Sequence, residues 1–155
     1  MKAILPGSYD PITVGHLDII RRAAEIYDEI YVVAFINPNK KYRFSAEERV
    51  KMLSLATEGL NTVTDYSEGL VIDYMKAHSI DVIVKGYRND TDLAYEKIQA
   101  EWNKENGGFE TVLIKCSPEL SEVSSTRVRE ALDLGDSVHS LLPESVEKFI
   151  RELNK

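Results

Sequence analysis

Two features of the sequence predict an α/β fold built on a doubly wound, five-stranded parallel sheet with helices on both faces. Short apolar runs alternate along the chain with amphipathic segments that are long enough to form helices. Several of these amphipathic segments also begin at residues that commonly cap helices. Because strand–helix–strand units connect in a right-handed sense, this alternation favours parallel strands that are covered on both sides.

The first half of the chain contains three predicted strands and the two helices between them. The strands are runs of apolar and β-branched residues, at 2–5, 29–36 and 62–66. The first helix is predicted to begin near His16, where a polar turn gives way to an amphipathic segment. The second is predicted to begin near Ser45, because Ser45 and Glu48 form the S-x-x-E pattern of a capping box, and Gly59 suits its end.

The second half of the chain continues the same alternation. Two further strands are predicted, at 81–85 and 110–116. Helices are predicted to begin near Gly69, Thr91 and Ser124, of which the second is long and polar and reaches residue 106. Gly135 suits the end of the helix that begins near Ser124, and Pro143 suits the first turn of a last helix over 143–153.

Composition limits the function classes that need to be considered. A length of 155 residues predicts a single domain, residues 1–155, and the apolar stretches are too short to span a membrane. We expect a cytoplasmic protein, because no signal peptide precedes the first strand. The net charge of −7 argues against a general nucleic-acid-binding protein. The lone cysteine, Cys116, excludes an internal disulfide and is most simply a buried, inert thiol.

Unusual polar residues follow four of the five predicted strands. In a Rossmann-like sheet, ligands bind at the carboxyl ends of the strands, near the switch in strand order. The residues in question come after strands one, two, four and five, and are Ser8 and His16, Lys40 and Lys41, residues 85–88, and residues 124–129. Hydroxyls, cations and helix starts at one edge of a sheet suit a polyphosphate. Neither G-x-x-x-x-G-K-[S/T] nor G-x-G-x-x-G is present in the required context.

His16 is the strongest candidate for a catalytic residue. A lone histidine is commonly structural, but its place behind Thr13-x-Gly15 at a helix start favours function. There the helix dipole disfavours the imidazolium, so we expect a neutral ring that donates a hydrogen bond to an oxygen gaining negative charge. His78 and His139 are expected to be solvated surface residues.

The remaining polar candidates each have a simpler alternative. Lys40 and Lys41 can be a solvated pair, although the position after a central strand favours Lys40 as a phosphate contact. Gly86 would let a ligand approach the backbone closely. The alternatives for the other candidates are structural: a helix cap at 124–126, surface arginines at Arg127 and Arg129, a shared helix face for Asp92 and Glu96, and a solvated or subunit-contacting Trp102.

Two motifs resemble those of a known enzyme superfamily. Ser8-x-x-x-x-Thr13-x-Gly15-His16 and Ser124-Ser125-Thr126-x-x-Arg129 are similar to the T-x-G-H and S-S-[S/T] motifs of nucleotidyltransferases. Within that superfamily the chain resembles the bacterial phosphopantetheine adenylyltransferase family, from Lys2 to about Leu153. The segments that carry this resemblance are P-G-S-Y-D-P-I-T-x-G-H-x-D-I, N-P-N-K-K with F-S-x-E-E-R, K-G-Y-R with D-x-x-Y-E, and L-P-E-S-V.

The resemblance implies a reaction and a set of site residues. ATP and 4′-phosphopantetheine would give dephospho-coenzyme A and pyrophosphate, with Mg²⁺, in coenzyme A biosynthesis, and the enzyme would be a homohexamer. The acceptor phosphate would attack the α-phosphorus in line, with His16 stabilising the transition state. The acceptor would be held by Ser8, Lys40, Val71 and Lys85. ATP would be held by Ser8, Tyr9, His16, Gly86, Tyr87, Arg88, Glu96, Leu120, Ser121, Glu122, Val123, Ser124, Ser125 and Thr126.

The chain departs from the family at three positions, and two other functions remain open. Ser8 and Tyr9 stand where the family often has Thr and Phe, and Lys85 stands where it usually has Arg. Lysine offers a point charge to a phosphate and no bidentate fork. The alternatives are a nicotinamide mononucleotide adenylyltransferase, which shares the two superfamily motifs, and a non-catalytic nucleotide sensor on the same fold.

Overall fold

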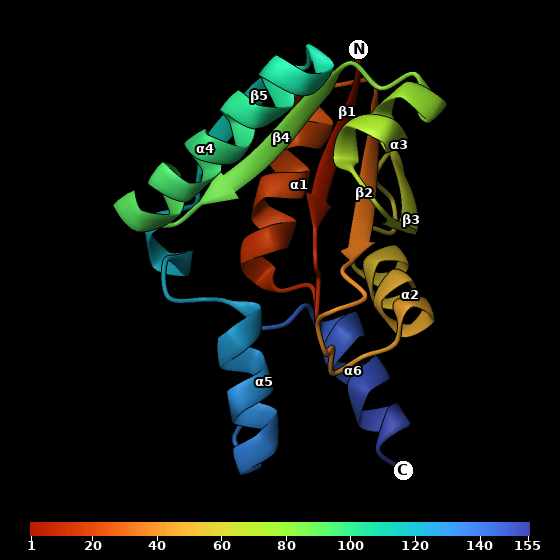
Figure 1. Cartoon of the computed structure of the whole chain (residues 1–155). Coiled ribbons are helices and arrows are strands. Elements are labelled where there is room, and N and C mark those ends of the chain that lie inside the picture. Colours follow the sequence, from red (N-terminus) through yellow and green to blue (C-terminus); the bar gives the residue numbers. More distant parts are fainter.

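The computed structural model describes residues 1–155 and contains one five-stranded parallel sheet with the order β3-β2-β1-β4-β5 (Figure 1). The strands, in chain order, are β1 (Lys2–Gly7), β2 (Glu29–Ile36), β3 (Thr62–Glu68), β4 (Val82–Tyr87) and β5 (Thr111–Lys115). The chain runs outward from β1 to β3 and then returns to the other side of β1, so the strand order switches between β1 and β4. The predicted Rossmann-like α/β fold is confirmed.

Six α-helices connect and flank the strands. They are α1 (Val14–Ile26), α2 (Ala46–Ala56), α3 (Val71–His78), α4 (Asp90–Gly107), α5 (Ser125–Leu134) and α6 (Glu144–Leu153), and a short 3₁₀ helix, η1, covers Pro118–Leu120. The capping box at Ser45 and Glu48 is present, and Gly135 ends α5 in the left-handed conformation, as predicted. Pro143 precedes α6 as its N-cap instead of lying in its first turn, and α2 ends before Gly59.

One boundary difference affects the site. The sequence predicts that the fourth strand ends at Lys85, but β4 continues to Tyr87 because Tyr87 is still paired with Lys115 of β5. Lys85 and Gly86 therefore lie within the strand. A Cβ atom added at Gly86 would come within 2.7 Å of Ile19 Cγ1 on α1. The packing of α1 thus requires a glycine here, a reason that differs from the predicted approach of a ligand.

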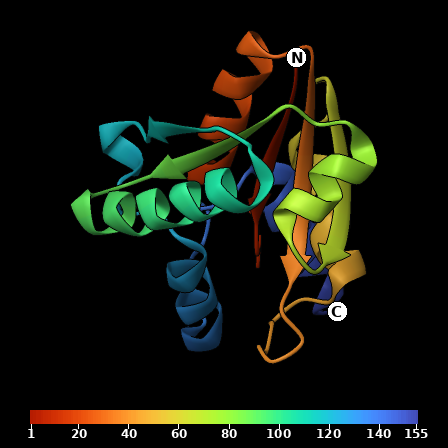
Figure 2. The same ribbon diagram turned by 45° about the horizontal axis from the view of Figure 1, so that its top comes forward.

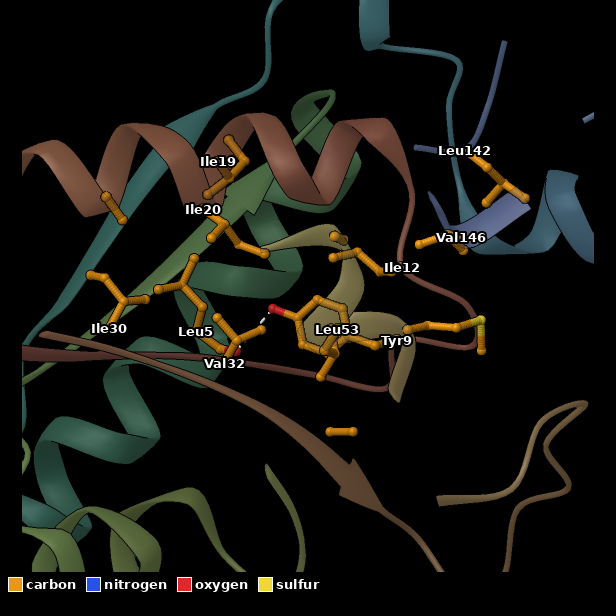
Figure 3. Packing of buried hydrophobic residues seen from close by; sticks show 14 of the residues in the cluster. Leu5, Tyr9, Ile12, Ile19, Ile20, Ile30, Val32, Leu53, Leu142 and Val146 are labelled. Carbon is orange, nitrogen blue, oxygen red and sulfur yellow. Dashed lines mark hydrogen bonds between the residues drawn. The ribbon is translucent and has the colours of Figure 1, made fainter. Parts of the chain in front are cut away.

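The two faces of the sheet bury separate apolar clusters. Leu5, Val32 and Val84 point toward the side covered by α1, α2 and α6, where they form part of a 22-residue core (Figure 3). Ile4, Val33 and Ile83 are the neighbouring residues along the same strands, and they pack against α3 in a second cluster of six. This alternation follows from the two-residue repeat of a strand, so the sheet is covered on both faces.

The elements that follow β5 lie beyond the carboxyl edge of the sheet. In Figure 1, α5 and α6 lie on the side toward which β1 and β2 point. Val146 and Ile150 anchor α6 in the larger core, and Val128 does the same for α5. In Figure 2, α4 runs across β4 on the outside of the sheet, and none of its side chains is buried. No helix is both long enough and apolar enough to cross a membrane.

Candidate active site

A cavity of about 320 Å³ opens at the carboxyl ends of β1 and β4, where the strand order switches. Its lining comes from the turn after β1, the end of β4, the start of α4, and the segment from Cys116 to the start of α5. Every residue predicted to hold ATP lines this cavity except Ser121 and Glu122. The sheet topology therefore brings together residues that are more than a hundred positions apart in the sequence.

The turn after β1 aims His16 into the cavity through a capping box. Thr13 is the N-cap of α1, and its hydroxyl accepts a hydrogen bond from the His16 backbone N–H at 3.3 Å. The His16 ring takes the place of the usual Glu or Gln, because its Nδ1 accepts the Thr13 backbone N–H at 3.0 Å. Since Nδ1 is an acceptor, the neutral ring carries its proton on Nε2. The capping box thus fixes both the orientation and the tautomer of His16.

Tyr9 stabilises the same turn by packing beneath the His16 ring and bonding back to β1. It is buried, its φ is 48°, and its hydroxyl donates a hydrogen bond to the Leu5 carbonyl at 2.9 Å (Figure 3). A positive φ is uncommon for a tyrosine, and such backbone strain is often found at functional sites. The Tyr9 ring meets the His16 ring edge-on, with 5.0 Å between centroids. The predicted site residue Tyr9 therefore acts mainly as a rigid packing partner of the His16 ring.

The surroundings of His16 keep its imidazole neutral. Burial, helped by the nearby cations Lys85 and Arg88, lowers its pKa from 6.5 to about 4. The predicted neutral state is confirmed, although burial and two nearby cations account for it, where the sequence suggested the helix dipole. A neutral ring with a proton on Nε2 can donate one hydrogen bond into the cavity.

The low pKa of His16 predicts how stability depends on pH. Between pH 6.5 and 4 the unfolded chain binds a proton at His16 that the folded chain does not, so the free energy of unfolding falls as the pH is lowered through this window. His16→Gln should lack this part of the pH dependence. Urea unfolding of both proteins at pH 7 and pH 5 measures it, and an equal loss of stability in the two would contradict the shifted pKa.

Lys85 and Arg88 approach the cavity from β4, and each is held by a carboxylate on α4. The Lys85 ammonium donates to the Pro6 carbonyl at 3.2 Å and lies 3.7 Å from Glu96. Arg88 donates its backbone N–H and its Nε to Asp92, both at 3.1 Å. Asp92 and Glu96 thus share one face of α4, as their spacing predicts.

The surroundings of Glu96 shift the pKa of its carboxyl group. Burial raises its pKa, and the nearby Lys85 partly offsets this effect. Asp92 and Glu96 between them hold two cations in place, and all four side chains belong to residues that line the cavity.

The start of α5 forms the opposite wall. The Ser124 hydroxyl caps the helix by accepting the Arg127 N–H at 3.2 Å, and the Ser125 hydroxyl donates to the Pro11 carbonyl at 2.7 Å. Arg127 and Arg129 do not line the cavity; their guanidinium groups bond the carbonyls of Glu122 and Asp10. The helix N-terminus therefore faces the cavity with its amides, while the two arginines have structural contacts.

A second cavity, of about 330 Å³, adjoins the first on the α3 and α4 side of the sheet. Val71, predicted to contact the acceptor, lines it together with Phe35 and Asn103. Five residues line both cavities, and they are Pro6, Gly7, Ser8, Lys85 and Glu96. Two ligands could thus meet at this shared boundary.

Lys40, like Ser121 and Glu122, is a predicted site residue that lines neither cavity. It lies on the exposed loop between β2 and α2, with its ammonium 5.5 Å from the centroid of the Tyr42 ring. His78, His139 and Trp102 are exposed, and Cys116 is buried beside the first cavity, as the sequence predicts.

Sequence reasoning missed two buried charged residues beside the site. Asp10 is 3% exposed and accepts the backbone N–H groups of Arg43 and Phe44 at 2.9 and 3.0 Å. Arg49 is 2% exposed and donates to the Ser8 carbonyl at 3.1 Å. Asp10 fastens the segment before α2 to the turn after β1, and Arg49 fastens α2 itself to the same turn. Both residues lie within segments that carry the family resemblance, and this was the only signal available in the sequence.

Comparisons with known proteins agree with this geometry. The family model of cytidylyltransferase-like proteins matches residues 4–131, which include β1 through most of α5. A phosphopantetheine adenylyltransferase from Clostridium novyi (strain NT) is 43% identical over 150 residues, which cover 96% of this chain and 93% of the relative. On this evidence the chain belongs to the phosphopantetheine adenylyltransferase family of the cytidylyltransferase-like proteins.

Proposed function

We propose that this chain transfers AMP from ATP to 4′-phosphopantetheine, which gives dephospho-coenzyme A and pyrophosphate. The observation that carries the proposal is the neutral His16, which keeps its Nε2 proton free to donate and lines a cavity together with Lys85, Arg88 and a helix N-terminus. This is a set of donors suited to a phosphoryl group that gains negative charge. The 43% identical relative, named for this activity, supports the choice of substrates.

The two adjoining cavities suit the two substrates. ATP would occupy the first, with its phosphates near residues 86–88 and the start of α5 and its base near residues 120–123. A Cβ atom added at Gly15 would lie 3.5 Å or more from other protein atoms, so packing does not require a glycine there. Close approach of a ligand in the cavity could require it instead. The pantetheine arm would occupy the second cavity, against Val71, with its phosphate at the shared boundary formed by Ser8 and Lys85.

The chemistry is then a direct displacement. An oxygen of the acceptor phosphate bonds to the α-phosphorus of ATP as the bond from that phosphorus to the bridging oxygen breaks, and pyrophosphate leaves with the electron pair. The chain contributes position and charge: Lys85 and Lys40 would hold the acceptor phosphate, and Arg88 would hold the nucleotide. His16 would donate its hydrogen bond to an α-phosphate oxygen as charge develops there.

Mg²⁺ is proposed as part of the Mg·ATP substrate. No group of three His, Cys, Asp or Glu side chains lies close enough together to hold a metal ion, and Asp92 and Glu96 already hold cations. Mg²⁺ commonly binds through substrate phosphates and water with few protein ligands, which is compatible with this donor set. It would neutralise phosphate charge, while Lys85, Arg88 and His16 act as described.

We also propose that the protein is a homohexamer with a cytoplasmic location. Helix α4 exposes Tyr95, Ile98 and Trp102 at a spacing that places them on one face. An exposed apolar stripe of this kind is typical of a contact between copies. The hexamer itself rests on the family resemblance, and the location rests on the proposed use of ATP. Light scattering coupled to gel filtration would measure the oligomeric state.

Release of pyrophosphate tests the proposed reaction and separates it from a nucleotide sensor. With Mg·ATP and 4′-phosphopantetheine, the protein should release one pyrophosphate for each dephospho-coenzyme A formed. A sensor would bind ATP and release none, and that result would overturn the proposal.

The division of labour between cations gives a further prediction. Lys40→Ala should weaken binding of 4′-phosphopantetheine about tenfold, whereas Arg88→Ala should weaken binding of ATP by about tenfold or more. A tenfold loss of affinity corresponds to the lower end of the range for a charge-assisted hydrogen bond. Isothermal titration calorimetry with each ligand alone measures both. Lys41→Ala is the matched control, because Lys41 is an exposed lysine on the same loop and should change neither affinity. Loss of the same ligand in both variants would show that the assignment is wrong.

A further inference from the structure

Arg49 is a buried cation for which the proposed chemistry has no use. Its side chain is 2% exposed, and it belongs to none of the ion pairs of the chain. A buried charge without an opposite charge is costly unless other groups solvate it. The contacts of the guanidinium group therefore indicate what it holds in place.

These contacts join two segments that are far apart in the sequence. On one side, Arg49 Nη1 donates to the carbonyl of Ser8, a residue that lines both cavities. On the other side, the guanidinium carbon lies 4.0 Å from the centroid of the Tyr42 ring, a close cation–π stack. A weaker bond from Nε to the Ser45 carbonyl, at 3.4 Å, anchors the group to the start of α2.

Tyr42 in turn organises the loop between β2 and α2. Its hydroxyl accepts the backbone N–H of Asn37 at 2.9 Å, and the Lys40 ammonium lies over its ring at 5.5 Å. The loop of residues 37–42 is thus folded about the Tyr42 side chain. Figures 1 and 2 both show this segment beyond the carboxyl end of β2.

We propose that Arg49 is a positioning residue that holds the loop of Lys40 and the turn of Ser8 in a fixed relative position, so that both can engage the acceptor phosphate. The inference rests on the proposed function, in which Ser8 and Lys40 act on that phosphate. A planar guanidinium can stack on a ring and donate sideways to a carbonyl at the same time. An ammonium group has no plane to stack, so lysine is not an equivalent here.

Steady-state kinetics with each substrate varied in turn tests this role. Arg49→Lys and Tyr42→Leu should each lower kcat/KM for 4′-phosphopantetheine by about 10- to 100-fold, because a misplaced contact of about 1 Å can cost that much. The affinity for ATP alone, measured by calorimetry, should stay unchanged. Tyr42→Phe keeps the stacked ring and should retain most of the activity. Because the two residues act through one contact, the double variant should lose no more than the larger single loss.

Arg43→Lys provides the matched control. Arg43 is an exposed arginine near the same loop, paired with Asp133, and its substitution should leave kcat/KM for both substrates unchanged. Wild-type kinetics for 4′-phosphopantetheine in Arg49→Lys would overturn the inference. So would losses that add in the double variant, or that fall equally on ATP, because those results describe a residue that merely stabilises the fold. Absence of turnover in the wild-type protein would instead overturn the proposed function.

Discussion

His16→Ala lowers kcat by about 10²- to 10³-fold, the range found when one transition-state donor is removed, and leaves ATP affinity nearly unchanged. The reason is geometric: Nδ1 is occupied by the Thr13 N–H, so only Nε2 can act on the substrate. That donor meets the most charge in the transition state and contributes little to ground-state binding. Single-turnover kinetics together with ATP calorimetry separate the two effects.

His16→Gln is the control that separates catalysis from folding. Glutamine can take the same place in the capping box and accept the Thr13 N–H, so the stability of α1 should be kept. Its amide N–H donors are not held on a rigid ring at the position of Nε2, so kcat should still fall. If His16→Gln or His16→Ala turned over at the wild-type rate, His16 would be a structural cap and not a catalytic residue.

Lys85→Met weakens binding of the acceptor phosphate by roughly 1.5–3 kcal/mol, the scale of a charge-assisted hydrogen bond. Lys85 lines both cavities at the boundary where the two substrates would meet. Lys85→Arg should preserve or strengthen this binding, because a guanidinium can form a bidentate contact with phosphate. Calorimetry with 4′-phosphopantetheine measures both variants.

Glu96 complicates the interpretation of Lys85→Met and supplies its control. Lys85 holds the pKa of Glu96 down against the effect of burial, so its removal leaves that carboxyl group without its cation. The double variant Lys85→Met with Glu96→Gln removes the unpaired carboxyl group as well. If the double variant bound the acceptor as the wild type does, the loss in the single variant would belong to Glu96, and Lys85 would not contact the phosphate.

The fold could be predicted because local signals and the global arrangement agree. Most strands are runs rich in apolar and β-branched residues, and capping residues such as Ser45, Ser124 and Gly135 lie at the ends that the structure shows. The predicted end of β4 was wrong because Gly86 and Tyr87 look like loop residues in the sequence. Pairing with β5 keeps them in the strand, and the local sequence of one strand does not reveal its pairing with another.

The site could be predicted only in part, for a similar reason. The rule that ligands bind at the carboxyl ends of parallel strands placed His16, Arg88 and Ser125 around one cavity. The same rule cannot show that Arg49 is buried, because an arginine near a helix start is usually exposed and only its tertiary partners reveal otherwise. It also cannot show that Gly86 is required by Ile19 of α1.

The choice of acceptor tests the central claim most directly. Purified wild-type protein is given Mg·ATP with either 4′-phosphopantetheine or nicotinamide mononucleotide, and pyrophosphate release is followed in both. The account predicts release with 4′-phosphopantetheine, formation of dephospho-coenzyme A by mass, and no release above background with nicotinamide mononucleotide. Release with nicotinamide mononucleotide and none with 4′-phosphopantetheine would contradict it.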